Sequence, residues 1–240
     1  MVGPTDGERP DSGGFETALT FISEEILAGR YVSGSRLPAE RALAADLGVS
    51  RGAVREAIKV LQAQGIVSAS VGAGHGTRIT TTQGSAFGRM LRLHLALQST
   101  SYDDLTETRV VLERAAAQAA AGHADADSLA GLADLAEQMA EVHDTALFND
   151  LDTAFHVAIA AMADNQLIRD LTIAIRQAVA GRILDAEERL EDWGSLRLRL
   201  VAEHDGIRQA LGSGDGAAAA DLVETHIRSA HRALLPADVR

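Results

Sequence analysis

The sequence predicts a mainly α-helical protein built from two domains. Leu, Ala and charged residues recur at helical spacing over most of the 240 residues, and 46% of all residues are hydrophobic, enough for a buried core. The β-leaning runs, residues 66–70 and 77–82, flank a glycine-rich segment, VGAGHG. Charge is also unevenly distributed, because residues 30–80 carry a net +4 and residues 83–240 a net −11. We therefore expect a disordered tail (1–13), a small head (14–82) and an all-helical body (83–236).

The head should contain three helices followed by a β-hairpin. The spacing of apolar residues predicts a first helix over Phe15–Gly29 and a second over Pro38–Leu47, with Pro38 in its first turn. A third helix starts after Ser50, a good N-cap, and ends at Gly65. The short turn between the second and third helices, followed by a hairpin, is the layout of a winged helix-turn-helix.

The body should be an antiparallel bundle of six or seven helices. From Ala86 onward strand signals disappear, and helical spacing continues to the end of the sequence. The expected breaks between helices are Ser99–Ser101, Gly122–Ala124, Ala163–Asn165, Asp192–Gly194 and Gly212–Gly216.

Composition excludes several kinds of function. The absence of cysteine removes disulfides, thiolate nucleophiles and Cys-ligated metals, so any metal site must use His and carboxylate ligands. No stretch approaches 18 apolar residues and the polar N-terminus lacks a signal-peptide core, so we expect a cytoplasmic protein without a membrane contact. The net charge of −12 argues at first sight against nucleic acid, but the basic head argues for it.

The start of the third helix predicts contact with DNA. A recognition helix reads base edges with its N-terminal residues, and Arg51 and Arg55 lie there four residues apart, on one face. Arginine matches guanine O6 and N7, or a phosphate, with two hydrogen bonds. An isolated Arg pair is usually only solvated, but the turn before this pair and the wing after it favour DNA binding. The GAGHG segment is not interpreted as a nucleotide loop, because it lacks the full G-x-G-x-x-G spacing and precedes a β-leaning run.

The segment RLPAERALAADLGVSRGAVREAIKVLQAQGIV, residues 36–67, resembles the signature of the GntR family of bacterial transcription regulators. The resemblance implies that Arg41, Arg51 and Arg55 contact double-stranded operator DNA. It also implies that the wing glycine, Gly76 preceded by His75, enters the minor groove. We include Ser50 in the expected DNA-binding set. The sequence departs from the family at Gly52 and Ala53, where Thr followed by Thr or Pro is common, which puts some contacts in doubt.

Four residues of the body are candidate metal ligands. Asp152 and His156 lie four apart, so they project from one helix face, within a mostly apolar pattern where such groups are costly unless paired or ligating. His204 and His226 lie on two later helices. One Asp and three His suit Zn²⁺ or a similar divalent ion, although any single His is more often a surface or core residue. The spacing does not by itself bring three helices together.

Residues 103–233 resemble the all-helical C-terminal (FCD) domain of the FadR subfamily of GntR regulators, through LTETRVVLERAAAQAAA, DTAFHVAIAAMADNQ and the helices of His204 and His226. This resemblance implies a divalent metal, with zinc expected and nickel or manganese as alternatives, bound by Asp152, His156, His204 and His226. It also implies a small carboxylate effector beside the metal and in contact with Arg109. The alternative for Arg109 is a simple salt bridge with Glu113.

The predicted function is that of a homodimeric transcription regulator, a repressor whose operator binding is controlled by a small organic acid, and not an enzyme. Dimerisation is expected because paired operator half-sites need paired readers. Two alternatives remain: a metal-dependent hydrolase, which needs a base such as Glu203 or Glu224 near the cluster, and a metal-free regulator responsive to acyl-CoA. The length excludes relatives fused to an aminotransferase-like domain, and the missing strands exclude an α+β effector domain.

Overall fold

The computed structural model describes residues 12–70, 76–80, 85–97 and 100–234. It separates into two compact units, divided between residues 82 and 83, and each is described by itself. A disordered tail was expected over residues 1–13, and residues 1–11 of it lie outside the described residues. Residues 12 and 13 already belong to the first helix, so the helix begins earlier than the apolar spacing predicted.

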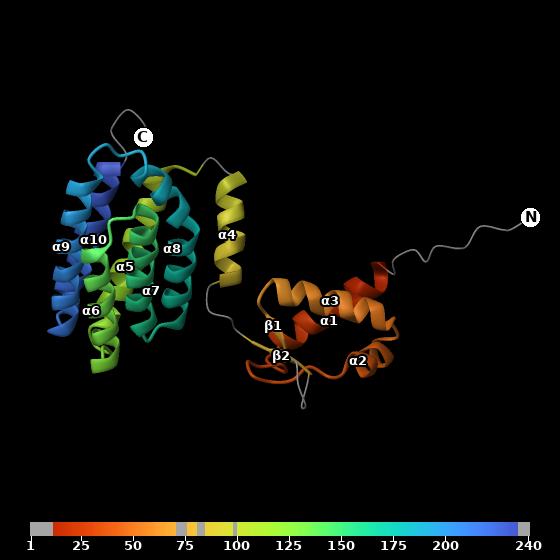
Figure 1. Cartoon of the computed structure of the whole chain (residues 1–240). Coiled ribbons are helices and arrows are strands. Elements are labelled where there is room, and N and C mark those ends of the chain that lie inside the picture. The colour runs from red at the N-terminus through yellow and green to blue at the C-terminus, as the bar shows by residue number, and fades with distance from the viewer. Residues whose placement is uncertain (1–11, 71–75, 81–84, 98–99, 235–240) are drawn as a thin grey trace, which may run out of the picture. The chain divides into compact units, whose positions relative to one another are not determined.

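The first unit contains three helices and an antiparallel hairpin, as predicted (Figure 1). The helices are α1 (Ser12–Leu27), α2 (Glu40–Leu47) and α3 (Arg51–Ala63), and the strands are β1 (Val67–Ser70) and β2 (Gly76–Ile79). Ile22 of α1 and Val54 of α3 are fully buried in a core that also takes up side chains from α2 and the hairpin. This small core holds α3 with its opposite, charged face outward.

Local capping explains where α2 and α3 begin and end. Gly48 adopts the left-handed conformation with φ of 66°, which a glycine allows without strain, and so ends α2. The Ser50 hydroxyl accepts a hydrogen bond from the Ala53 amide at 3.1 Å, which confirms Ser50 as the N-cap of α3. Pro38 was expected in the first turn of α2, but the helix begins at Glu40 and Pro38 precedes its cap. The helix therefore starts two residues later than predicted.

Seven helices follow in the described part of the second unit (Figure 1). Six of them, α5 to α10, form the bundle, and α4 packs along α8. Their bounds are α4 Ser85–Leu97, α5 Tyr102–Ala120, α6 Ala126–Glu141, α7 Thr145–Met162, α8 Gln166–Glu187, α9 Trp193–Gly212 and α10 Gly216–Leu234. None of the described helices is long and apolar enough to cross a membrane.

One break between helices was absent from the prediction, at the end of α6. Asp144 caps the next helix, α7, by accepting a hydrogen bond from the Leu147 amide at 2.8 Å. Arg197 of α9 donates to the carbonyl oxygens of Met139, Ala140 and Val142, which lie at the C-terminal end of α6. Arg197 lies more than 50 residues further along the chain. The local sequence therefore contains the residue that begins α7, Asp144, but not the side chain that satisfies the end of α6.

A glycine brings α10 close to α5. A Cβ on Gly216 would lie only 2.7 Å from the backbone oxygen of Gln118, so any larger residue would push the two helices apart. This pair of helices makes the most extensive packing in the bundle. The contact matters for the site because α5 carries Arg109 and Glu113, and α10 carries His226.

Candidate metal centre and effector pocket

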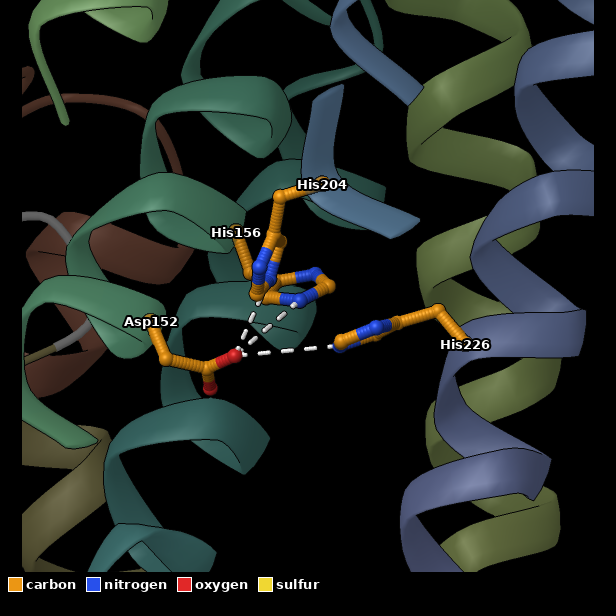
Figure 2. A group of neighbouring side chains, drawn as sticks. All are labelled: Asp152, His156, His204 and His226. Atoms are coloured by element: carbon orange, nitrogen blue, oxygen red, sulfur yellow. Dashed lines mark ion pairs between the residues drawn. The ribbon is translucent and has the colours of Figure 1, made fainter. Parts of the chain in front are cut away.

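The bundle brings Asp152, His156, His204 and His226 together (Figure 2). One potential ligand atom from each of the four residues lies within 4.8 Å of the other three. Asp152 Oδ1 is the common neighbour, because it lies 3.8, 3.1 and 3.7 Å from the Nε2 atoms of His156, His204 and His226. All four residues are buried, and His204 is completely inaccessible.

Packing of three helices produces this convergence. Asp152 and His156 occupy successive turns of α7, and their neighbours Phe148, Phe155 and Ile159 fill the core on the same helix. The ring of Phe155 lies edge-on to His204, with ring centres 4.8 Å apart. The apolar residues therefore fix the helices, and the polar residues occupy a pocket within that packing.

Two of the histidines are oriented by glutamates behind them. His156 Nδ1 lies 2.7 Å from Glu113 Oε2, and His226 Nδ1 lies 2.9 Å from Glu203 Oε2. A carboxylate at Nδ1 favours the tautomer whose Nε2 carries a lone pair, which is the arrangement metal-binding histidines use. Glu113 is itself held by Arg109, whose Nε donates to Oε1 at 2.8 Å. These outer contacts therefore direct the Nε2 atoms of both rings toward Asp152.

The residues fit a divalent ion. His156 Nε2 and both nitrogens of His204 have no hydrogen-bond partner among the described residues, although they are buried. Buried polar atoms without partners are costly, and a metal ion satisfies such nitrogens. Ligands of a zinc ion lie about 2.0–2.1 Å from it, so only a small inward movement of these side chains is needed. Three imidazoles and one carboxylate favour zinc, nickel or a related ion over calcium or magnesium.

The protonation states also suit metal binding. Burial lowers the pKa of His156 to about 4, even though Glu113 partly offsets it, and burial also lowers the pKa of His204. Burial opposes ionisation of Asp152, but the Arg176 guanidinium holds the pKa of that carboxyl well below its usual range. Burial disfavours charge on His226 as well, yet hydrogen bonds with Asp152 and Glu203 raise its pKa. The site thus offers one carboxylate and two imidazoles whose neutral form is favoured, whereas a proton on His226 competes more strongly with a metal ion.

A pocket opens beside the cluster. It has about 640 Å³ of empty space, including part of its mouth, and Asp152 and His226 form part of its wall. Arg109, the residue expected to contact the effector, lines this pocket. It also forms the salt bridge with Glu113, so the two alternatives for Arg109 do not exclude each other. The apolar part of the wall comes from α5, α8, α9 and α10, namely Leu105, Val179, Ile183, Ala186, Leu200, Ala230 and Leu234.

The sequence interpretation did not anticipate several pocket residues. Arg176 of α8 is fully buried and forms an ion pair with Asp152 Oδ2, and Arg182 and Glu187 of the same helix also line the pocket. His231 of α10, five residues after His226, lines the pocket as well, and its Nε2 lies 3.1 Å from Asp103 Oδ1. The available signal was the spacing of Arg176 and Glu187, which are eleven residues apart and so share one face of α8; both contact α7, through Asp152 and Asn149.

Glu203 and Glu224, the candidate general bases of the hydrolase alternative, are both bonded to other side chains. Glu203 contacts His226 and Ser229, whereas Glu224 pairs with Arg114 at 2.6 Å and with Arg228 at 2.7 Å. Neither glutamate lines the pocket. Neither glutamate is therefore placed to act as the general base that the hydrolase alternative requires.

In the head, the predicted DNA-contacting arginines are exposed. Arg41 lies on α2, and Arg51 and Arg55 lie on the first two turns of α3. Arg55 forms an ion pair with Glu40 at 3.0 Å, which holds its guanidinium near the start of α2. Gly76 is the first residue of β2, and His75 lies outside the described residues. The structure thus presents three arginines from the helix-turn-helix to the outside, and the DNA roles of this set remain predictions.

Known families match both units. The model of the bacterial regulatory proteins of the gntR family matches residues 16–78, and the FCD domain model matches residues 104–229. LutR, an HTH-type transcriptional regulator of Bacillus subtilis, is 29% identical over 84% of this chain and 92% of its own length. The galactonate operon transcriptional repressor of Escherichia coli is 28% identical over 89% of this chain and 93% of its own length. In a solved structure, Streptococcus agalactiae GntR matches with a TM-score of 0.61 and 26% identity, covering 91% of this chain and 99% of that one.

A helix-turn-helix with a wing, followed by a helical bundle with a buried Asp/His cluster, defines a class of DNA-binding regulator. This chain belongs to the GntR family, in the FadR-like subfamily that carries a C-terminal FCD domain. The relatives named above are transcriptional regulators and not enzymes, and this chain is a transcriptional regulator of the same family.

Proposed function

We propose that this chain is a metal-dependent repressor whose operator binding is controlled by a small carboxylate metabolite. One observation carries the proposal: two members of the Asp152/His156/His204/His226 cluster, Asp152 and His226, form part of the wall of a pocket that Arg109 also lines. A pocket with a metal pole, arginines and an apolar lining suits a small organic anion. The E. coli relative supports this reading, since the operon in its name concerns galactonate, itself a small carboxylate.

The four cluster residues would hold the divalent ion, with zinc the expected occupant. When bound, the ion supplies positive charge and open coordination positions for a ligand oxygen. Arg109 and Arg176 contribute fixed positive charge on the same wall, and the apolar residues exclude water from it. Glu113 and Glu203 keep His156 and His226 in place through their Nδ1 atoms. An anion that enters the pocket thus contacts residues from α5, α7, α8 and α10 at once, and can change how these helices pack.

The head would bind double-stranded DNA through Arg41, Ser50, Arg51, Arg55 and the wing around His75 and Gly76. The exposure of the arginines and the basic charge of residues 30–80 support this assignment. The acidic body reduces non-specific attraction to DNA, so the small head selects the site. A repressor of this type acts where its operator is, in the cytoplasm.

We also propose that the active form is a homodimer that uses α4. Phe87, Met90, Leu93 and Leu97 are exposed on one side of this helix, away from α8, and two of them are more than 60% exposed. A row of large apolar side chains at helical spacing is a typical contact surface between two copies of a helix. A second copy would pair two heads for two half-sites.

DNA binding by the metal-loaded protein tests the proposal. Fluorescence anisotropy with DNA from the protein's own promoter region should show salt-sensitive, sequence-specific binding that a panel of organic acids changes at least tenfold, and chelation should abolish the acid effect. Absence of sequence-specific binding would refute the regulator. A response to long-chain acyl-CoA that persists in chelator would instead establish the metal-free alternative.

A further inference from the structure

One carboxylate on the pocket wall is not used by the metal cluster. Arg109, Arg176, Arg182, Asp152 and Glu187 all line the pocket. Asp152 is held by Arg176 and by the histidines, whereas Glu187 forms no ion pair of its own within the described residues. A second carboxyl group in a pocket for an anion is unfavourable unless it has a specific partner, because it repels the ligand whenever it is ionised.

Glu187 is positioned to accept a hydrogen bond from a ligand in the pocket. It lies in the last turn of α8, is only 3% exposed, and its Oε2 accepts a hydrogen bond from Asn149 Nδ2 at 3.3 Å. Its Oε1 has no hydrogen-bond partner in the part of the chain that the structure describes. Asn149 lies one turn before Asp152 on α7, so the Asn149–Glu187 pair adjoins the metal cluster. A carboxyl oxygen with an open valence on the wall of a ligand pocket needs a donor when the pocket is filled.

We propose that Glu187, held by Asn149, makes the pocket selective for hydroxy carboxylates, with the effector's carboxylate toward the metal and arginines and one of its hydroxyl groups donating to Glu187. The inference rests on the proposed function and specifies the class of effector. A hydroxyl is favoured over an ammonium group by charge: three arginines line the wall with Asp152 and Glu187, and a divalent ion leaves it net positive whether or not Glu187 is ionised. A hydroxy acid brings a net negative charge, whereas an amino acid zwitterion brings none.

The state of the Glu187 carboxyl is consistent with this role. Burial, followed by the negative charge of Asp152, raises the pKa of Glu187 to about 8. The carboxyl accepts a hydrogen bond from a hydroxyl in either protonation state. A ligand without a hydroxyl leaves this group desolvated and without a donor. Sites built in this way reject analogues that lack the donor, by about tenfold to a hundredfold for one hydrogen bond to a charged or polar group.

Matched pairs of ligands test the inference on the full-length, zinc-loaded protein. Isothermal titration calorimetry compares lactate with propanoate, glycolate with acetate, and gluconate with hexanoate, each pair differing in its hydroxyl groups. We expect at least one hydroxylated member to bind tenfold or more tightly than its deoxy partner. Glu187→Ala should reduce that ratio to about one, and Glu187→Gln, which keeps an acceptor oxygen, should retain part of it. Glu188→Gln is the control, because it makes the same chemical change at the next residue, which is exposed.

The outcomes separate the two proposals. If carboxylates bind but the wild type shows no preference for a hydroxyl in any pair, or the preference survives Glu187→Ala, the role of Glu187 is wrong and the carboxylate sensor stands. If zinc-loaded protein binds none of the six acids and its DNA binding responds to no organic acid, the proposed function itself fails. Zinc content measured for every variant by atomic emission ensures that a lost preference does not reflect a lost metal.

Discussion

His204 offers the most direct test of the metal centre. It lies on α9, its ring is completely buried, and neither ring nitrogen has a hydrogen-bond partner among the described residues. We expect zinc to stabilise the wild-type protein strongly and the His204→Gln variant hardly at all. The quantity to compare is the stabilisation caused by zinc in each protein, because the substitution itself also alters the core.

The size of the effect follows from the buried atoms. A buried polar atom without a partner costs about 1–3 kcal/mol, so binding the Nε2 atoms of His156 and His204 relieves about 2–6 kcal/mol. The unfolded chain does not hold the four ligands together, so most of the binding free energy adds to the free energy of unfolding. Linkage gives a similar range, about 2.7 kcal/mol at free zinc 100-fold above Kd and about 4.1 kcal/mol at 1,000-fold. For a chain of this size these values correspond to a rise in Tm of about 5–16 °C.

The assay is thermal unfolding followed by circular dichroism, in buffered free zinc and in chelator. His143→Gln is the matched control, because His143 is exposed between α6 and α7 and should leave the zinc-induced rise unchanged. Equal rises in Tm for His204→Gln and the wild type would refute the site. So would a wild-type protein whose Tm does not change between chelator and saturating zinc.

Three further predictions concern other parts of the molecule. In chelator, Glu187 should contribute a fall in the free energy of unfolding as pH rises from about 4.5 to 8, because its raised pKa lets the folded chain hold a proton that the unfolded chain releases. The lowered pKa values of His156 and His204 contribute the opposite slope, so the quantity to compare by urea unfolding is the difference between the wild type and Glu187→Gln, whose stability should fall less or rise more with pH; identical slopes would contradict it. Arg51→Ala should weaken binding to promoter DNA about tenfold or more, and should reduce by about 1 the slope of log binding constant against log salt concentration. Arg189 is an exposed arginine of the body, so Arg189→Ala should change neither quantity; equal anisotropy titrations for the two variants would contradict the DNA role of Arg51. Leu93→Glu should shift the protein from dimer to monomer in light scattering. Leu167 of α8 is exposed to a similar extent, so Leu167→Glu is the control and should leave the dimer intact; a dimer unaffected by Leu93→Glu places the interface elsewhere.

Local sequence signals were sufficient for most of the fold. The order of helices and strands, the capping by Ser50 and Gly48 and the hairpin could all be predicted, because each depends on residues within a few positions of one another. The errors have the same origin. The break after α6 depends on Arg197, which is distant in sequence, and Pro38 occupies the approach to a helix instead of its first turn.

The candidate site shows the same division. Two features could be predicted from the sequence alone: the basic charge of the head and the types of metal ligand. The ligand types follow because the chain contains no cysteine and places Asp152 and His156 one turn apart. Only the tertiary structure decided that His204 and His226 reach Asp152, that Glu113 and Glu203 stand behind two of the rings, and that Arg176 and Glu187 line the pocket. The physical reason is that helical periodicity specifies the direction of a side chain around its own axis, whereas convergence depends on how apolar faces pack helices together. A buried charge such as Arg176 is also invisible to hydrophobic periodicity, because the partner that makes its burial tolerable lies on another helix.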